Sequence, residues 1–174
     1  MNKVVVSTDW AESFPYVAKH DAKVLVLGSI PGQASLKQVQ YYAHPRNAFW
    51  PIMQALLGLP SELDYTDRLT ALKEQKVALW DVAHQCHRPG SLDSRIDQQT
   101  VVPNAIEAFL ANHPDVELIA FNGQAASKLF KRHFPALVKS DLIQQVTLPS
   151  TSPAHASLSF AEKLEAWQVI AKYL

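Results

Sequence analysis

The chain has 174 residues, its 16 lysines and arginines balance 16 aspartates and glutamates, and 48% of its residues are hydrophobic. This length and composition predict a single soluble globular domain over 1–174, and the zero formal charge excludes a global electrostatic attraction to nucleic acid or to anionic membranes. The one cysteine, Cys86, excludes an internal disulfide and an all-cysteine metal site. Because no apolar run approaches the roughly 18 residues of a membrane span and the first residues do not form a signal peptide, we expect a cytoplasmic protein.

Four short apolar runs alternate with helical stretches along the chain. Strands are predicted at 23–27, 76–80, 116–121 and 145–148, and helices at 47–57, 66–75, 103–112, 124–133 and from Phe160 to the last residue. Ser159 and Glu162 form a capping box before the last helix, whose apolar residues recur at helical spacing. The alternation predicts a three-layer α/β/α fold with a central, four-stranded, mainly parallel sheet covered on both faces.

Polar residues or tight turns follow each of the four predicted strands. The first strand leads into the turn Gly28-Ser29-Ile30-Pro31-Gly32, the second into Asp81, the third into Asn122-Gly123 and the fourth into 149–153. Right-handed parallel crossovers bring these strand ends to one edge of the sheet, where the sites of open α/β proteins collect. We therefore expect the active site at this edge.

The glycine turn does not match the phosphate-binding loops of nucleotide enzymes. It lacks the spacing of a dinucleotide fingerprint, no Gly-Lys-Ser/Thr follows it, and Ser29 does not lie in a nucleophile elbow. Its central residue is Ile30, where a catalytic turn would be expected to carry a polar side chain.

The segment 41–50 reads Tyr-Tyr-Ala-His-Pro-Arg-Asn-Ala-Phe-Trp and concentrates aromatic and polar side chains. One interpretation is a helix start, with Asn47 as the N-cap and with Phe49 and Trp50 in the core. A helix N-terminus at the catalytic edge also exposes free N–H groups that suit a phosphate or a leaving anion. We expect both interpretations to hold.

Together these motifs resemble those of the uracil-DNA glycosylase superfamily, and within it those of the hypoxanthine-DNA (deoxyinosine) glycosylase family. The resemblance covers the chain from about Val24 to the C-terminus, with the motifs in family order. It implies a monofunctional DNA glycosylase of base-excision repair, which flips a deaminated base out of DNA and hydrolyses its N-glycosidic bond. It also implies a monomer that uses no cofactor or metal and whose partner is double-stranded or single-stranded DNA.

The resemblance also implies roles for particular residues. In most relatives the third residue of the first motif positions the attacking water, which Ile30 cannot do. In the deoxyinosine family the asparagine of the His-Pro-Arg-Asn segment is credited with this water, and the matching residue is Asn47. A carboxamide orients water well, and an oxocarbenium-like sugar is so electrophilic that we expect orientation to be enough. Asn122 matches a position whose side chain contacts the base or aids catalysis.

The other expected site residues line the base pocket or hold the DNA backbone. Phe49 resembles the aromatic that stacks on the flipped base, with Trp50 or Tyr42 in that role if Phe49 is buried. Asp81 lies where a carboxylate meets a purine N–H or caps the next loop. The segment from Ser150 to His155 resembles the motif that holds phosphate, with Ala154 or His155 as the wedge into the duplex. The base pocket is expected to comprise Gly28, Ser29, Ile30, Pro31, Gly32, Tyr42, Phe49, Asp81 and Phe121, and the backbone contacts His44, Arg46, Ser150, Thr151, Ser152 and His155.

Several alternatives stay open. Uracil, or a G:U or G:T mismatch, competes with hypoxanthine as substrate because base choice depends on a few pocket contacts. A non-catalytic module that binds damaged DNA or a nucleotide would explain Ile30, and a small-molecule hydrolase would use Ser29 or Cys86. The run His84-Gln85-Cys86-His87-Arg88 has ligands too adjacent for zinc, so we expect a buried cysteine with loop histidines. DNA binding at zero net charge would need a local patch of cations, for which the chain offers Arg46, Lys128, Lys131, Arg132 and His133.

Overall fold

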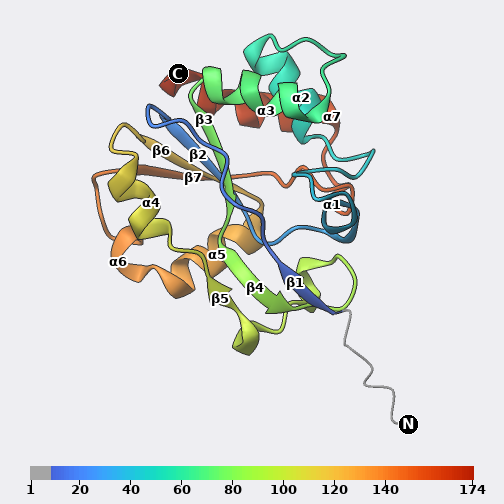
Figure 1. Ribbon diagram of the computed structural model, residues 1–174, viewed down its shortest axis with the longest axis vertical. Coiled ribbons are helices and arrows are strands. Elements are labelled where there is room, and N and C mark those ends of the chain that lie inside the picture. The colour runs from blue at the N-terminus through green and yellow to red at the C-terminus, as the bar shows by residue number, and fades with distance from the viewer. Residues whose placement is uncertain (1–8) are drawn as a thin grey trace.

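A computed structural model describes residues 9–174, and a parallel sheet of four strands lies at its centre (Figure 1). The strands are β2 (Val24–Gly28), β3 (Val77–Asp81), β6 (Leu118–Asn122) and β7 (Gln144–Leu148), in the spatial order β3-β2-β6-β7. All neighbouring pairs are parallel. The four predicted strands are confirmed, each within two residues of its predicted bounds.

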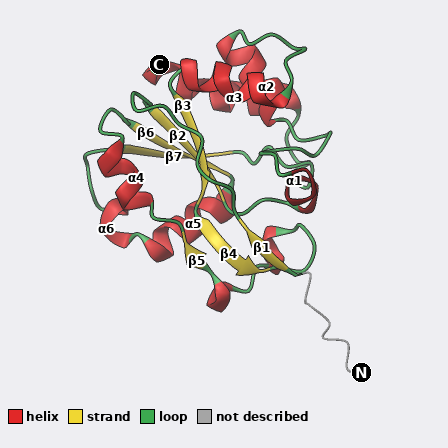
Figure 2. Ribbon diagram, viewed as in Figure 1, coloured by secondary structure: helices red, strands yellow, loops and turns green. Residues whose placement is uncertain are grey.

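Helices cover both faces of this sheet, which confirms the predicted three-layer arrangement (Figure 2). On one face lie α2 (Phe49–Leu57), α3 (Tyr65–Glu74) and α7 (Phe160–Trp167), and the chain continues from α7 as a 3₁₀ helix, η3 (Gln168–Tyr173). On the other face lie α4 (Ile106–Asn112), α5 (Gln124–His133) and α6 (Pro135–Val138). Side chains of β2 alternate between the two cores, Val24 and Val26 toward α2 and Leu25 and Leu27 toward α5, as a strand buried on both faces requires.

Most predicted helices are confirmed with shifted ends. The helix predicted at 47–57 begins at Phe49, and the one predicted at 103–112 begins only at Ile106, because Pro103 belongs to a short strand. The capping box is present, since Ser159 Oγ accepts from Glu162 N and a Glu162 carboxylate oxygen accepts from Ser159 N. Two short helices, α1 (Gln33–Gln38) and α6, were not predicted, since neither is long enough for an apolar period to emerge.

A second, antiparallel sheet was not predicted. It consists of β1 (Trp10–Glu12), β4 (Ala83–His87) and β5 (Val102–Pro103), in the order β1-β4-β5. The expectation of loop histidines at 84 and 87 is therefore wrong, although Cys86 is fully buried as expected. The single residue Val82 separates β3 from β4, so one run of chain passes directly from the parallel sheet into the antiparallel one.

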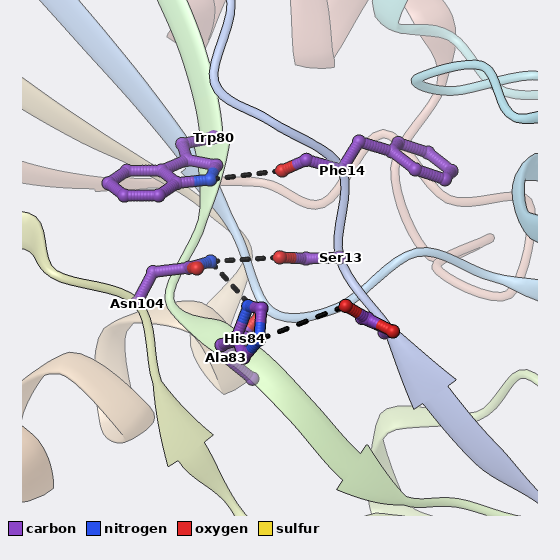
Figure 3. Close-up of polar contacts among 7 residues, drawn as sticks. Ser13, Phe14, Trp80, Ala83, His84 and Asn104 are labelled. Atoms are coloured by element: carbon purple, nitrogen blue, oxygen red, sulfur yellow. Dashed lines mark hydrogen bonds and ion pairs between the residues drawn. The ribbon is translucent and has the colours of Figure 1, made fainter.

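Asn104 fixes the corner between β3 and β4. It is buried, and its Nδ2 donates to the Asp81 carbonyl at 2.8 Å. The same Nδ2 donates to Ser13 Oγ at 2.9 Å and to the Ala83 carbonyl at 3.2 Å (Figure 3). Nearby, Trp80 Nε1 donates to the Phe14 carbonyl at 3.1 Å (Figure 3). These bonds attach the segment around Ser13 to the corner and hold the backbone at the end of β3.

No helix in the described part of the chain, residues 9–174, has the length and apolar character that a membrane span requires.

We expect the substitution Asn104→Ala to lower the free energy of unfolding by roughly 1–3 kcal/mol, because it leaves buried carbonyl groups at the corner without their donor. Chemical denaturation followed by circular dichroism measures this difference. The matched control is Gln98→Ala at an exposed position, which we expect to change stability by less than about 0.5 kcal/mol. Equal stabilities of the two variants would contradict this role for Asn104.

Candidate active site

The carboxyl ends of the four parallel strands meet around a cavity of about 310 Å³. The turn Gly28–Gly32 follows β2, Asp81 ends β3, Asn122 ends β6, and the segment Ser150–Ala154 follows β7, and all of them line the cavity. The volume lies at the lower end of the range of about 300–1,000 Å³ that is typical of small-molecule sites. The edge expected from the sequence is therefore a real concave site.

Gly28 forms part of the cavity floor, and its lack of a side chain shapes the site. It lies directly opposite Asp81 in the register of β2 and β3. A Cβ atom on Gly28 would lie 2.5 Å from Asp81 Oδ1 and 3.3 Å from the Tyr42 hydroxyl oxygen. Ile30 is 6% exposed and packs into the core beneath α5, so it supplies an apolar part of the lining and no polar group.

Two buried polar groups of the cavity have no hydrogen-bond partner among the described residues. They are Oδ2 of Asp81 and the hydroxyl of Tyr42. Burial, together with the nearby carboxylate of Asp93 and despite Arg88, raises the pKa of Asp81 from 3.8 to about 7. Burial and the charge of Asp81 also raise the pKa of the Tyr42 phenol, so this hydroxyl keeps its proton. Unpartnered buried polar groups are costly, which marks these two atoms as candidates for ligand binding.

A second carboxyl group, that of Asp93, lies at the rim of the same cavity. Ser29 Oγ donates to Asp93 Oδ1 at 2.6 Å, which joins the glycine turn to η1 (Asp93–Arg95). Although the residue as a whole is exposed, reduced hydration of its carboxyl raises the pKa of Asp93, against the lowering effects of the Ser29 hydrogen bond and of Arg88.

Arg88 is a fully buried cation close to both carboxyl groups. Its Nη2 donates to the Pro31 carbonyl at 2.8 Å and its Nε to the Gly90 carbonyl at 2.9 Å, whereas Nη1 has no hydrogen-bond partner in the described residues. Burial lowers the pKa of Arg88, and the charges of Asp93 and Asp81 oppose this effect. One buried cation thus faces two carboxyl groups, an imbalance that favours the neutral form of one of them.

Phe49 does not line the cavity, so it is not available to stack on a ligand there. Its side chain is fully buried, and its ring stacks on that of Tyr42 with centroids 4.1 Å apart and planes at 28°. Tyr42 lines the cavity, and it is one of the two aromatic residues expected to stack on the base if Phe49 is buried. Its backbone has φ of 56°, an uncommon value for a bulky residue and one that often marks a functional site. Phe121 also lies in the core, packed on Phe130, and not in the cavity.

Asn47 lines the cavity just before α2. Its Oδ1 accepts from the Phe49 backbone N–H at 2.9 Å, whereas the N-cap position of the helix is Ala48 and not Asn47. The sequence interpretation therefore placed the cap one residue too early, although the asparagine does satisfy a free N–H of the first turn. This bond orients the carboxamide and leaves its Nδ2 without a hydrogen bond among the described residues.

Asn122 holds the segment that follows β7. Its Nδ2 donates to Thr151 Oγ1 and its Oδ1 accepts from Thr151 N, both at 2.9 Å. Ala48 N donates to the Thr151 carbonyl at 2.9 Å, so Thr151 also connects to the start of α2. Thr151 is 1% exposed, which places its hydroxyl away from any DNA backbone. Asn122 lines the cavity, where its amide lies near the Tyr42 hydroxyl and partly offsets the raised pKa of that phenol.

The residues expected to contact DNA are spread around the mouth of the cavity. His44, Ser150, Ser152 and Ala154 line it, whereas Arg46 and His155 do not. Arg46 is exposed, and its backbone N–H donates to His44 Nδ1 at 3.1 Å. The turn after β7 is compact, since His155 N donates to the Ser152 carbonyl at 3.0 Å.

The cations of the proposed basic patch do not gather at this edge. Arg46 belongs to the segment that borders the cavity, whereas the other four cations lie in α5, with Lys131, Arg132 and His133 in its last turn and Lys128 before them. Helix α5 begins beside Ser150 at Gly123, so its last turn lies about 15 Å further from the cavity.

The run from His84 to Arg88 does not form a metal site. His84 Nε2 lies 3.8 Å from Glu12 Oε1, and His87 Nε2 lies 3.7 Å from Asp9 Oδ2. Within residues 9–174, no three His, Cys, Asp or Glu side chains are arranged to bind a metal ion. Burial also raises the pKa of the Cys86 thiol, which makes it a poor nucleophile.

The sequence left open whether the run Ser91-Leu92-Asp93-Ser94 lines the pocket, and it gave Arg88 no role there. Ser91, Leu92 and Asp93 close one side of the cavity, and Ser91 Oγ accepts from Gln33 N at 2.9 Å. A polar run so far from the first motif carries no periodic signal, and only the return of the chain from β4 brings it to the site. The sequence offered one indication: residues 91–93 come shortly after β4, the strand along which the chain leaves the catalytic edge.

Comparisons with known proteins agree with this arrangement. Residues 14–171 match the profile of the family described as "Uracil DNA glycosylase superfamily". The chain is 35% identical over 118 residues to a protein of Methanosarcina barkeri (67% of this chain and 73% of that protein) and 30% identical over 161 residues to one of Methanosarcina acetivorans (92% and 97%). Both relatives are named hypoxanthine DNA glycosylase.

A solved structure has the same fold. The solution NMR structure of a Methanosarcina acetivorans protein, described as a candidate uracil DNA glycosylase, superimposes with a TM-score of 0.78 at 29% sequence identity and covers 94% of this chain and 97% of that one. Both the family profile and a relative that matches nearly the whole chain include every strand that borders the cavity. The chain belongs to the uracil DNA glycosylase superfamily.

Proposed function

We propose that this protein is a monofunctional DNA glycosylase that hydrolyses the N-glycosidic bond of hypoxanthine in DNA, as a step of base-excision repair. The observation that carries the proposal is the cavity of about 310 Å³ at which Asn47, Asp81 and Asn122 converge. The names of the two Methanosarcina relatives support hypoxanthine as the base. The name given to the NMR structure supports uracil as the competing substrate.

The cavity suits a base that has been flipped out of the duplex. A flipped base is recognised by stacking on an aromatic side chain and by hydrogen bonds to its polar edge. Tyr42, supported from behind by Phe49, offers the aromatic ring, and the carboxyl of Asp81 and the amide of Asn122 offer the polar groups. Ile30 supplies an apolar part of the wall.

Asn47 is the residue to which we assign the attacking water. Cleavage builds positive charge on the sugar and negative charge on the base, so a water held in line with C1′ gains most of its advantage from position. The bond from the Phe49 backbone N–H to Asn47 Oδ1 fixes the carboxamide, and Nδ2 together with the second lone pair of Oδ1 stays available to hold water. None of the described residues that line the cavity is a lysine, so a Schiff-base lyase step has no nucleophile there.

The proposal is tested by incubating the protein with duplexes that carry one hypoxanthine, uracil, xanthine or mismatched thymine, followed by alkaline cleavage of abasic sites. We expect hypoxanthine to be released fastest, because the two named relatives act on it. Faster release of uracil would assign the competing substrate. Binding to the damaged duplex without release of any of the four bases would contradict the enzyme and favour a non-catalytic damage-binding module.

Asn47→Ala is expected to lower the single-turnover rate of base release by about 10²-fold or more, because the water loses its orienting group. Binding of the inosine duplex, measured by fluorescence anisotropy, should change little. Asn112→Ala, at an exposed position at the end of α4, is the matched control. The substitution also removes the bond from Phe49 N to Asn47 Oδ1. Thermal unfolding of both variants therefore shows whether lost stability accounts for the slower base release. Undiminished release by a folded Asn47→Ala protein would remove Asn47 from the reaction.

Arg46→Ala is expected to weaken DNA binding and to reduce the slope of log Kd against log salt concentration by about one, because one phosphate contact is lost. The measurement is a salt titration of binding to the inosine duplex. Arg132→Ala serves as control, since Arg132 lies in the last turn of α5, away from the cavity, and we expect its slope to equal that of the unmodified protein. Identical slopes for the two variants would place Arg46 outside the DNA interface.

A further inference from the structure

The cavity holds more acidic groups than its one buried cation balances. The carboxyl groups of Asp81 and Asp93 both border it, and Arg88 is the buried cation near them. Arg88 directs two of its nitrogens to backbone carbonyls and forms no ion pair with either carboxylate in the described part of the chain. Both acids cannot be ionised there without a large electrostatic cost.

The hydrogen bonds of the two acids differ in a way that decides which one is neutral. Asp93 receives the Ser29 hydroxyl proton at 2.6 Å, a bond that favours a carboxylate. Asp81 is 4% exposed, and its Oδ2 has no partner. Its position is fixed by the packing of Oδ1 against Gly28 and by the bond from Asn104 Nδ2 to its carbonyl. The group that remains to carry a proton is therefore Oδ2 of Asp81, at the wall of the cavity.

The proton on Asp81 Oδ2 can neutralise the negative charge that develops on the leaving base. As the bond between C1′ and N9 breaks, its electron pair passes to the purine, and the negative charge spreads over the ring nitrogens and O6. An ionised carboxylate at this wall would repel the developing charge, whereas a neutral carboxyl would stabilise it by donating a hydrogen bond or a proton. This reasoning rests on the proposed glycosylase function.

We propose that Asp81 acts as the general acid of base release and transfers the proton on Oδ2 to N7 of the departing purine. The O–H bond of Asp81 breaks and an N7–H bond forms while the C1′–N9 bond breaks, so that hypoxanthine leaves as a neutral molecule. The water held by Asn47 adds its oxygen to C1′ and gives up one proton to bulk water. The Asp81 carboxylate then regains a proton from solvent, so the cycle consumes one water and no other reactant.

The pH dependence follows from the groups that face Asp81. They are Asp93 at the cavity rim, Arg88 after β4, and Tyr41 and Tyr42 before α2. The pKa of Asp81 is raised to about 7, whereas raised tyrosine pKa values keep both phenols neutral, so loss of the Asp81 proton falls within an accessible pH range. The active, protonated form therefore disappears as the pH rises through about 7.

The test is the single-turnover rate constant for hypoxanthine release from pH 5.5 to 9, with protein in excess over duplex. For the unmodified protein we expect a plateau below pH 7 and a tenfold fall per pH unit above it. For Asp81→Asn we expect a rate constant about 10²- to 10⁴-fold lower at pH 6 and no dependence on pH. The control Asp141→Asn, at an exposed position, should reproduce the unmodified profile. A rate that rises through pH 7, or full activity of Asp81→Asn, would overturn the proposal.

The pH–rate profile of Asp93→Asn provides a second test, because this profile would not shift if the role of Asp81 were purely structural. Removing the neighbouring negative charge lowers the pKa of Asp81, so the falling limb should shift to lower pH, whatever rate constant the plateau then has. If the falling limb does not shift, the pH dependence does not come from Asp81, which would contradict the proposal.

A direct titration of Asp81 keeps the proposal testable even if Asp81→Asn does not fold. The carboxyl carbon of Asp81, followed by ¹³C NMR in the unmodified protein, should titrate with a midpoint near pH 7, and a midpoint below 5 would overturn the proposal. Failure of the proposed glycosylase function can be told apart from failure of the Asp81 proposal, because a protein that releases no base from any duplex has no rate profile at all.

Discussion

The approach of Asp81 to the backbone of Gly28 is the contact on which the site depends. The parallel register pairs the two residues, and the pairing extends one step further, since Val82 N donates to the Gly28 carbonyl at 2.8 Å. A side chain on Gly28 would overlap Asp81 Oδ1, so the carboxyl occupies space that only a glycine leaves open. The end of β3 therefore supplies an acidic group, the carboxyl of Asp81, to the wall of the cavity.

A chain of hydrogen bonds carries this order across the site to Asn47. Asn122 holds Thr151 with two bonds, Thr151 accepts from Ala48 N, and Asn47 accepts from Phe49 N. The end of β6, the turn after β7 and the start of α2 are therefore fixed relative to one another. Rigid support of this kind is what a site needs if its catalytic power comes from orienting a water.

Much of this architecture could be predicted because the information is local. The strands are continuous apolar runs, and a glycine turn or a polar residue at the end of each strand reports the catalytic edge without any knowledge of packing. The fold class and the location of the site followed from these patterns. Family resemblance then pointed to Asn47, which the structure places in the lining of the cavity.

Other parts depend on contacts between distant segments, which no local pattern encodes. The strand β4 has polar residues at 84, 85 and 87 and forms only because β1 and β5 pair with it. Phe49 was the first candidate for stacking and Tyr42 an alternative to it, and packing against Trp167 buries Phe49 and leaves Tyr42 at the cavity. The role of Asp93 likewise depends on its return to Ser29, 64 positions away.

A crystal structure of the Asn47→Ala protein bound to a duplex with one inosine tests most directly whether the cavity is the base pocket. We expect the hypoxanthine ring to lie outside the helical stack and inside the cavity, beside Tyr42, with its N7 edge toward Oδ2 of Asp81. A base that remains stacked in the duplex, or one bound away from the turn Gly28–Gly32, would show that the four strand ends do not form the base pocket.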